Sequence, residues 1–215
     1  MKLLSQNVYL LVASYLNPVW WLIKKNTKSI LDVGCGDGKN GILLYMRMRK
    51  LSLTGVDIYQ KYLDIARARN CYEKLEKADV GKISYPSKSF DCVSCLQVIE
   101  HLNKKDAIEL VKRIENIAKH QVIISSPMGE LAQSEIGSNK YQSHRSSFTA
   151  KEFESLGYEV KLMGNRWLSS QEGIQKSNIS STFKSVFLLL DVLLTPLYSI
   201  FPFLANHYFI AYKSL

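Results

Sequence analysis

At 215 residues the chain is long enough for one globular domain with a full hydrophobic core, and its charged fraction of 22% is that of an ordinary globular protein. Four cysteines are too few for a disulfide-stapled secreted scaffold, so we expect buried thiols in a reducing cytoplasm. The net charge of +9 is spread over many short basic clusters, a pattern typical of solvated faces, which leaves an anionic membrane surface or nucleic acid open as partners.

Residues 1–28 are predicted to form an N-terminal helical segment ahead of the main domain. Residues 8–23 are rich in Leu, Tyr and Trp, and Lys24 and Lys25 follow them. One interpretation is a helix that packs across the core or covers a cofactor. The other is an interfacial segment, with Trp20 and Trp21 at the depth of lipid headgroups and the lysines on anionic lipid. No secretory signal is apparent, because polar residues break the apolar stretch.

Residues 29–41, SILDVGCGDGKNG, contain the first strong motif. Their apolar residues predict a buried strand, and the helical pattern after the glycines predicts a helix start. Glycines at 34, 36 and 38 permit positive φ and leave the backbone bare, while the new helix turns unpaired N–H groups toward the same space. We therefore expect a ligand to lie against this turn. Asp32 and Asp37 would repel a pyrophosphate but suit a ligand that carries an ammonium group and a sulfonium.

The next elements place acidic residues at two further strand ends. A helix over 40–49 and a strand over 51–56 lead to Asp57, about 20 residues beyond the glycines, where an acidic side chain can accept hydrogen bonds from a ribose diol. An aspartate in this place is also a common helix N-cap. A helix over 59–71 and a third strand over 75–78 then lead to Asp79 and Val80, which would equally suit a surface turn.

Residues 89–102, SFDCVSCLQVIEHL, form the second strong motif. They predict a fourth buried strand over 92–95 that leaves the sheet at Leu96-Gln97-Val98. Cys92 and Cys95 are three residues apart on this strand and should point to opposite faces of the sheet. Asn103 and Asp106 are expected to start the next helix as a capping pair.

The last part of the domain is predicted to contain three more strands. A helix over 107–118 and a strand over 121–125 precede a polar loop at 129–147, the kind of segment where substrate contacts concentrate. Thr149 and Glu152 form a capping box for a short helix, a sixth strand covers 158–163, and residues 207–213 suit a last strand.

Residues 165–206 are predicted to be an insertion between the last two strands. Its second part, 183–205, is strongly apolar but is interrupted by Asp191, Pro196 and Pro202. A spanning helix needs ~20 almost unbroken apolar residues, so we expect two short helices instead. They would form either a lid or dimer surface, or a segment that dips into one leaflet of a membrane.

Together, the apolar run with D-x-G-x-G-x-G at 32–38, the acidic Asp57 and the FD-x-V…H pattern of 90–101 resemble class I S-adenosylmethionine-dependent methyltransferases. The resemblance implies an α/β, Rossmann-like fold. Its sheet would have seven mostly parallel strands with the last one antiparallel and helices on both faces, formed by residues 29–164 and 207–215. It also implies S-adenosyl-L-methionine as cofactor, with S-adenosyl-L-homocysteine as product. In such enzymes the residues matching Asp57, Ile58 and Asp79 meet the ribose, the adenine ring and the adenine amino group. The cofactor-binding residues implied are Asp32, Gly34, Cys35, Gly36, Asp37, Gly38, Asp57, Ile58, Asp79, Val80, Leu96 and Gln97.

Methyl transfer from a sulfonium depends mainly on aligning donor and acceptor, and a base is needed only for an acceptor with a poorly acidic proton. His101, after the fourth strand, is the candidate for a general base or substrate contact, and His144 is a second candidate. Otherwise His101 is held by local packing. Quinone-ring O-methylating relatives hold a divalent cation with Glu-x-x-Glu-His, but here the first position is Gln97, followed by Glu100 and His101. Because the amide lacks the charge of a carboxylate, no metal is predicted.

The sequence therefore predicts a methyltransferase that acts on an oxygen of a small-molecule or lipid-linked acceptor, such as a glycan or a quinone precursor. The alternatives are RNA methylation and a cofactor-binding protein without catalysis. Nucleic acid is not expected, because no appended RNA-binding module is present. The predicted location is cytoplasmic, with peripheral membrane contact through 183–205 left open. The oligomeric state is not predicted.

Overall fold

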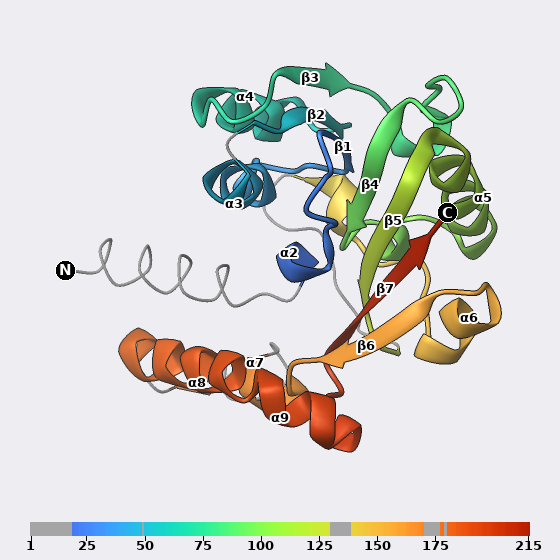
Figure 1. The fold of residues 1–215 in the computed structure, drawn as a ribbon. Coiled ribbons are helices and arrows are strands. Elements are labelled where there is room, and N and C mark those ends of the chain that lie inside the picture. Colours follow the sequence, from blue (N-terminus) through green and yellow to red (C-terminus); the bar gives the residue numbers. More distant parts are fainter. Residues whose placement is uncertain (1–18, 49, 130–138, 170–176, 179) are drawn as a thin grey trace.

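The computed structural model describes residues 19–48, 50–129, 139–169, 177–178 and 180–215 (Figure 1). Residues 1–18 of the predicted N-terminal segment, 130–138 of the polar loop and 170–176 of the insertion lie outside this part. Helix α2 (Val19–Leu22) is the described end of the N-terminal segment, and its Val19 and Trp20 are buried.

Seven strands form one sheet in the order β3-β2-β1-β4-β5-β7-β6. The first five in this order run parallel, and β7 is antiparallel to both β5 and β6. This confirms the predicted sheet and its antiparallel last strand. The strands are β1 (Ser29–Val33), β2 (Ser52–Asp57), β3 (Lys74–Lys77), β4 (Phe90–Leu96), β5 (Ala118–Pro127), β6 (Glu159–Met163) and β7 (Tyr208–Ser214).

Helices cover both faces of the sheet. On one face α2 and α3 pack on the core, and on the other face α5 and α6 do so. Figure 1 shows α3 and α4 beside β1 to β3, and α5 and α6 near β4 to β7. The helices after α2 are α3 (Lys39–Arg47), α4 (Gln60–Ala68), α5 (Lys104–Ile117), α6 (Ala150–Ser155), α7 (Arg166–Ser169), α8 (Ser181–Leu193) and α9 (Thr195–Ile200). Single 3-10 turns are η1 (Val80–Lys82), η2 (Ile99–His101), η3 (Lys140–Gln142) and η5 (Pro202–Leu204).

Successive side chains of a strand point to opposite faces of the sheet, so alternate residues of the central strands pack into the two halves of the core. Ile30 and Cys92 pack with α2 and α3, whereas Leu31, Val93 and Cys95 pack with α5 and α6. Cys92 and Cys95 therefore face opposite sides of the sheet, as predicted. All four cysteines are buried free thiols.

One of the two predicted helix caps is present. Thr149 Oγ1 accepts the Glu152 N–H, and the Glu152 carboxylate accepts the Thr149 N–H at 2.8 Å, which is the capping box. The capping pair predicted at α5 is wrong. Asn103 occupies the N-cap position, but its exposed side chain makes no cap hydrogen bond, and only its carbonyl, which accepts the Ala107 N–H, takes part in the helix.

In the described residues of the insertion, α7 follows β6 directly, and the apolar second part forms α8, α9 and the 3-10 turn η5, at the lower edge of the molecule in Figure 1. Asp191 of α8 is buried and accepts hydrogen bonds from the Asn165 N–H at 2.7 Å and from the buried Tyr198 hydroxyl of α9. This carboxylate therefore ties α8 to α9 and to the segment after β6. No helix in the described ranges is long and apolar enough to cross a membrane.

Candidate functional site

A cavity of about 370 Å³ lies at the carboxyl ends of β1, β2 and β4. In the sheet, β2 lies on one side of β1 and β4 lies on the other, so the strand order reverses between β1 and β4. The cavity lies at this topological switch point, which is the usual ligand position in open α/β folds. The residues that line the cavity are Gly34, Gly36, Asp57, Ile58, Asp79, Val80, Gly81, Lys82, Gln97, Val98, His101, Leu102, Asp106, Glu109, Asn139, Tyr141, Gln142 and Arg145.

The glycine turn forms one wall of the cavity and is tied back to the sheet. The N–H groups of Gly34 and Cys35 both donate to Val56 O, at 2.8 and 3.0 Å. Gly34 has φ +72°, and a Cβ on it would lie 2.3 Å from Val98 Cγ2. Gly36 has φ +54°, and its missing Cβ would meet nothing within 4 Å. The bare backbone at Gly36 therefore borders open space.

Asp57 links β2 to this turn. Its Oδ2 accepts the Gly36 N–H and its Oδ1 accepts the Tyr59 N–H, both at 2.8 Å. Burial raises the pKa of the Asp57 carboxyl, and these N–H donors oppose that shift. Each oxygen makes only one of these bonds and has a second lone pair, so the carboxylate can also accept hydrogen bonds from a ligand in the cavity.

The lining of the cavity carries more negative than positive charge. The lining contains four carboxylates and two cationic side chains: Asp57, Asp79, Asp106 and Glu109 against Lys82 and Arg145. Such a lining favours a ligand with positive groups over a pyrophosphate.

Seven of the twelve residues predicted to bind cofactor line the cavity: Gly34, Gly36, Asp57, Ile58, Asp79, Val80 and Gln97. Gln97 leaves β4 with φ +57°, and its Nε2 donates to Ser125 Oγ at 3.1 Å. The Asp79 side chain accepts the Gly81 N–H at 3.0 Å and so also caps η1.

The other five predicted cofactor residues lie outside the cavity lining: Asp32, Cys35, Asp37, Gly38 and Leu96. Asp37 is bound by cations of the same chain, with Arg69 Nη2 3.1 Å and Lys39 Nζ 3.3 Å from its Oδ2. Cys35 is buried, and burial raises the pKa of its thiol.

Asp32 lies beneath the turn, with 1% of its surface exposed. It accepts hydrogen bonds from the Tyr72 hydroxyl at 2.7 Å and from Ser94 Oγ at 3.0 Å. Burial raises the pKa of its carboxyl to about 6, although both hydroxyl donors oppose this. In this structure the Asp32 carboxylate therefore links β1 to Tyr72 and to Ser94 of β4.

Replacement of Tyr72 by phenylalanine should destabilise the protein in a pH-dependent way. The pKa of Asp32 in the folded protein, about 6, lies above its value of ~3.9 in an unfolded chain, so ionisation of Asp32 lowers the free energy of unfolding as the pH rises from ~4 to ~6. Tyr72→Phe removes a donor to the ionised carboxylate and pushes this pKa higher. We expect a loss of ~2 kcal/mol at pH 8 and a smaller loss at pH 5, measured by urea unfolding. An equal loss at both pH values would contradict this role, and Tyr45→Phe, at an exposed tyrosine, is the control.

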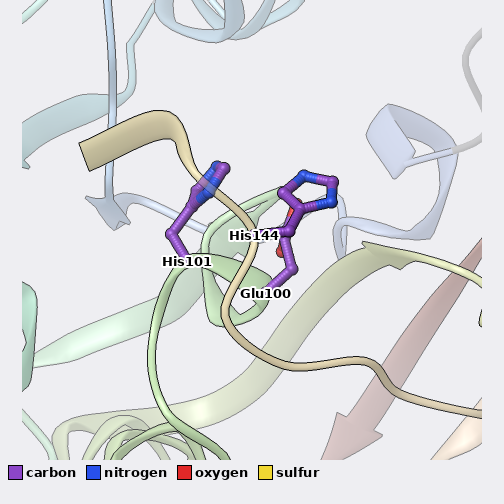
Figure 2. Close-up of side chains that lie close together, drawn as sticks. All are labelled: Glu100, His101 and His144. Atoms are coloured by element: carbon purple, nitrogen blue, oxygen red, sulfur yellow. The ribbon is translucent and has the colours of Figure 1, made fainter. Parts of the chain in front are cut away.

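His101 and His144 lie together beside the cavity. His101 lines it directly, whereas His144 is outside the lining and packs its ring against that of His101, with 5.1 Å between the centroids. His101 Nδ1 lies 3.2 Å from Ser143 O, and burial lowers the pKa of the imidazole. Figure 2 shows both rings with the side chain of Glu100, which precedes His101 on η2.

Several lining residues were not predicted as site residues from the sequence. Asp106 and Glu109 are three apart on α5, a spacing that places both on one helix face, but nothing local indicates that the face meets a ligand. Asn139, Tyr141 and Gln142 come from the loop after β5, which was expected to hold substrate contacts, although the sequence did not indicate which of its residues would line the cavity.

Comparisons with known proteins agree with this architecture. Residues 30–121 match the family model described as "Methyltransferase domain". A ubiquinone biosynthesis O-methyltransferase of Dechloromonas aromatica is 33% identical over 87 residues, which are 38% of this chain and 36% of that protein. The match thus spans about a third of that relative.

Two solved structures show the same fold. A SAM-dependent methyltransferase from Archaeoglobus fulgidus has a TM-score of 0.60 at 20% identity, covering 98% of this chain and 94% of that one. A phosphoethanolamine N-methyltransferase 2 of Haemonchus contortus, in complex with S-adenosyl-L-methionine, has a TM-score of 0.57 at 18% identity, covering 97% and 52%. Residues 30–121 thus resemble a methyltransferase domain, and the chain as a whole has the fold of these S-adenosylmethionine-dependent methyltransferase structures.

Proposed function

We propose that the protein transfers a methyl group from S-adenosylmethionine to an oxygen of a small, apolar acceptor. The observation that carries this proposal is the cavity at the switch point, where the bare backbone of Gly36 and the carboxylate of Asp57 meet under an acidic lining. A cavity of about 370 Å³ falls within the ~300–1,000 Å³ of small-molecule sites.

The residues of the cavity fit this cofactor group by group. The glycine turn would take the amino acid end, because no side chain fills the space over Gly36. Asp57 would accept hydrogen bonds from the ribose diol, and Ile58 and Val80 would pack on the adenine. Asp79 would meet the adenine amino group. The excess of carboxylates would stabilise the ammonium and sulfonium charges.

When bound, S-adenosylmethionine supplies a methyl group that is already activated by its positive sulfur. The chain then has to hold the acceptor in line and exclude water from the cavity. His101 is placed to contact the acceptor from η2. With Nδ1–H donated to Ser143 O, its Nε2 lone pair is available to take a hydroxyl proton, and its lowered pKa keeps the ring neutral near pH 7.

The acceptor class follows from the relatives and from the insertion. The curated relatives include proteins named ubiquinone biosynthesis O-methyltransferase and demethylmenaquinone methyltransferase. An acceptor of the quinone-precursor type combines a ring hydroxyl with an isoprenoid tail, and this chain has apolar helices near the end of its sheet. A hydroxylated, lipid-tailed ring is therefore the acceptor that we propose.

A transfer assay with labelled S-adenosylmethionine and a set of prenylated phenols tests this function. We expect label in the phenol ether and one adenosylhomocysteine for each methyl transferred. Tight binding of the cofactor without transfer to any phenol or to membrane extract would instead support a cofactor-binding protein without catalysis.

The insertion supports peripheral contact with a membrane. Exposed apolar residues of α8 recur at Phe183, Val186, Leu190 and Leu193, the spacing of one helix face. Ile200 of α9 and Phe203 of η5 are two further exposed apolar side chains of the insertion, at 69% and 77%. A face of this size on a basic protein suits an anionic lipid surface, from which a lipid-tailed acceptor could enter.

Polar substitution of this face should weaken binding to vesicles. We expect the full-length protein to float with phosphatidylcholine–phosphatidylglycerol liposomes, and the triple variant Phe183→Ser, Val186→Ser and Leu193→Ser to partition more than tenfold more weakly, because each buried apolar side chain contributes ~1.5 kcal/mol or more. The control, Met46→Ser with Ile65→Ser, removes apolar residues that are exposed on α3 and α4 and should float like the wild type. Equal flotation of all three proteins would remove the membrane role.

A further inference from the structure

The strongest unassigned feature is a group of three potential metal ligands next to the cavity. Glu100, His101 and His144 each offer one ligand atom, and these atoms lie within 4.8 Å of one another. Figure 2 shows Glu100 and His101 on one segment and His144 on the loop that crosses over it. The loop is held in this place by its backbone, because the N–H groups of Arg145 and Ser146 both donate to Glu100 O, at 2.8 and 3.1 Å.

One carboxylate oxygen of the buried Glu100 side chain lacks a hydrogen-bond partner. Glu100 is 2% exposed, and its Oε2 makes no hydrogen bond to any described residue. A buried carboxylate oxygen without a partner is costly, and such charges in proteins are usually paired or bind metals.

The contact of His101 with the backbone prepares it as a ligand. Ser143 O can only accept a hydrogen bond, so the ring nitrogen 3.2 Å away, Nδ1, must carry the proton. The other nitrogen, Nε2, then keeps its lone pair. Metal-binding histidines in proteins are oriented in this way, with the second ring N–H donated to a carbonyl or carboxylate.

We propose that Glu100, His101 and His144 bind one divalent transition-metal ion at the edge of the acceptor cavity. Two imidazoles and one carboxylate favour zinc, manganese, iron or cobalt over magnesium, which prefers all-oxygen sites. Tetrahedral ligands ~2.1 Å from an ion lie ~3.4 Å apart, so ligand atoms that lie up to 4.8 Å apart must close by up to ~1.4 Å. This movement would come from rotation of the half-buried His144 side chain. The positive charge of Arg145 opposes the cation, but that side chain is exposed and screened by water.

These three ligands differ from the set considered in the sequence analysis, which was Gln97, Glu100 and His101. Gln97, whose Nε2 donates to Ser125 Oγ, is not one of the three ligands, and the third ligand comes from a loop 43 residues after His101 in the chain. Three protein ligands leave positions open for an acceptor oxygen, whose pKa the cation would lower. His101 would then hold the cation, and the acceptor's hydroxyl proton would leave to water. This use rests on the proposed function, whereas binding of the ion does not.

Metal binding by the full-length protein, without cofactor or acceptor, tests the proposal. After treatment with EDTA and dialysis, we expect equilibrium dialysis to give about one zinc or manganese ion per chain and weaker binding of magnesium. His144→Ala and Glu100→Gln should each weaken zinc binding at least 100-fold. His120→Ala, at an exposed histidine that lies 4.0 Å from Asp91, should bind zinc like the wild type.

Two results would overturn the site. One is the absence of stoichiometric zinc or manganese binding by the wild type, and the other is unchanged zinc binding by His144→Ala, a loop variant that leaves the core intact. Visible absorption of bound cobalt gives a second readout, because its loss in Glu100→Gln reports a lost ligand rather than lost activity. If methyl transfer persists in EDTA, the metal ion does not activate the acceptor oxygen, but the proposed methyltransferase function is unaffected.

Discussion

Replacement of Asp57 by alanine is expected to weaken the binding of S-adenosylhomocysteine by about 100-fold. The carboxylate would accept two hydrogen bonds from the ribose, and hydrogen bonds to a charged group contribute ~1.5–3 kcal/mol each. A loss of ~3 kcal/mol corresponds to two powers of ten in the dissociation constant. The substitution also removes the acceptors of the Gly36 and Tyr59 N–H groups, which loosens the glycine turn and adds to the effect. Isothermal titration calorimetry measures it.

Asp64→Ala is the matched control for this variant. Asp64 lies on α4, is exposed and pairs with Arg67 at 3.0 Å, so its removal should leave the affinity unchanged. Binding by Asp57→Ala within threefold of the wild type would mean that the ribose does not lie at the end of β2.

Gly34→Ala should be among the most destabilising single changes in the glycine turn. At φ +72° an L-residue costs ~1–2 kcal/mol, and its Cβ would overlap Val98 Cγ2 at 2.3 Å, an overpacking that costs ~1–3 kcal/mol. We expect a loss of ~3 kcal/mol in the free energy of unfolding, measured by urea denaturation.

Two variants separate the strain from the overlap. Gly36→Ala also has positive φ, but its Cβ meets nothing within 4 Å, so it should cost only ~1–2 kcal/mol. Val98→Ala removes the atom that Gly34→Ala meets, and in a double-mutant cycle it should recover part of the loss. Equal destabilisation by Gly34→Ala and Gly36→Ala, with no coupling to Val98, would show that this close approach does not limit the turn.

The features predicted correctly depend on residues close together in the sequence. The glycine turn, the capping box of Thr149 and Glu152 and the alternation of β4 are each contained in fewer than a dozen residues, so their local chemistry decides their structure. The seven-stranded, mostly parallel sheet with its antiparallel last strand followed from the family resemblance that two such motifs and Asp57 carry. The apolar part of the insertion, predicted as two short helices, contains α8 and α9, which meet at Leu194 just before Pro196, whereas Asp191 lies inside α8 and does not interrupt it.

The features that could not be predicted depend on partners that are distant in the chain. Asp32 has the sequence context of a ligand-binding acid, but Tyr72 and Ser94, 40 and 62 residues away, hold its carboxylate below the turn. Asp37 similarly meets Arg69, 32 residues later. His144 approaches Glu100 and His101 only because the loop after β5 folds back over η2. No local pattern marks these contacts, since they arise from tertiary packing.

The proposed function depends on which ligand the cavity at the ends of β1, β2 and β4 binds. Calorimetric titration of the full-length protein with S-adenosylhomocysteine and, separately, with NADH tests this most directly. We predict one adenosylhomocysteine bound per chain and no heat of binding with NADH, because the acidic lining disfavours a pyrophosphate. Saturable binding of NADH with no uptake of adenosylhomocysteine would contradict the account.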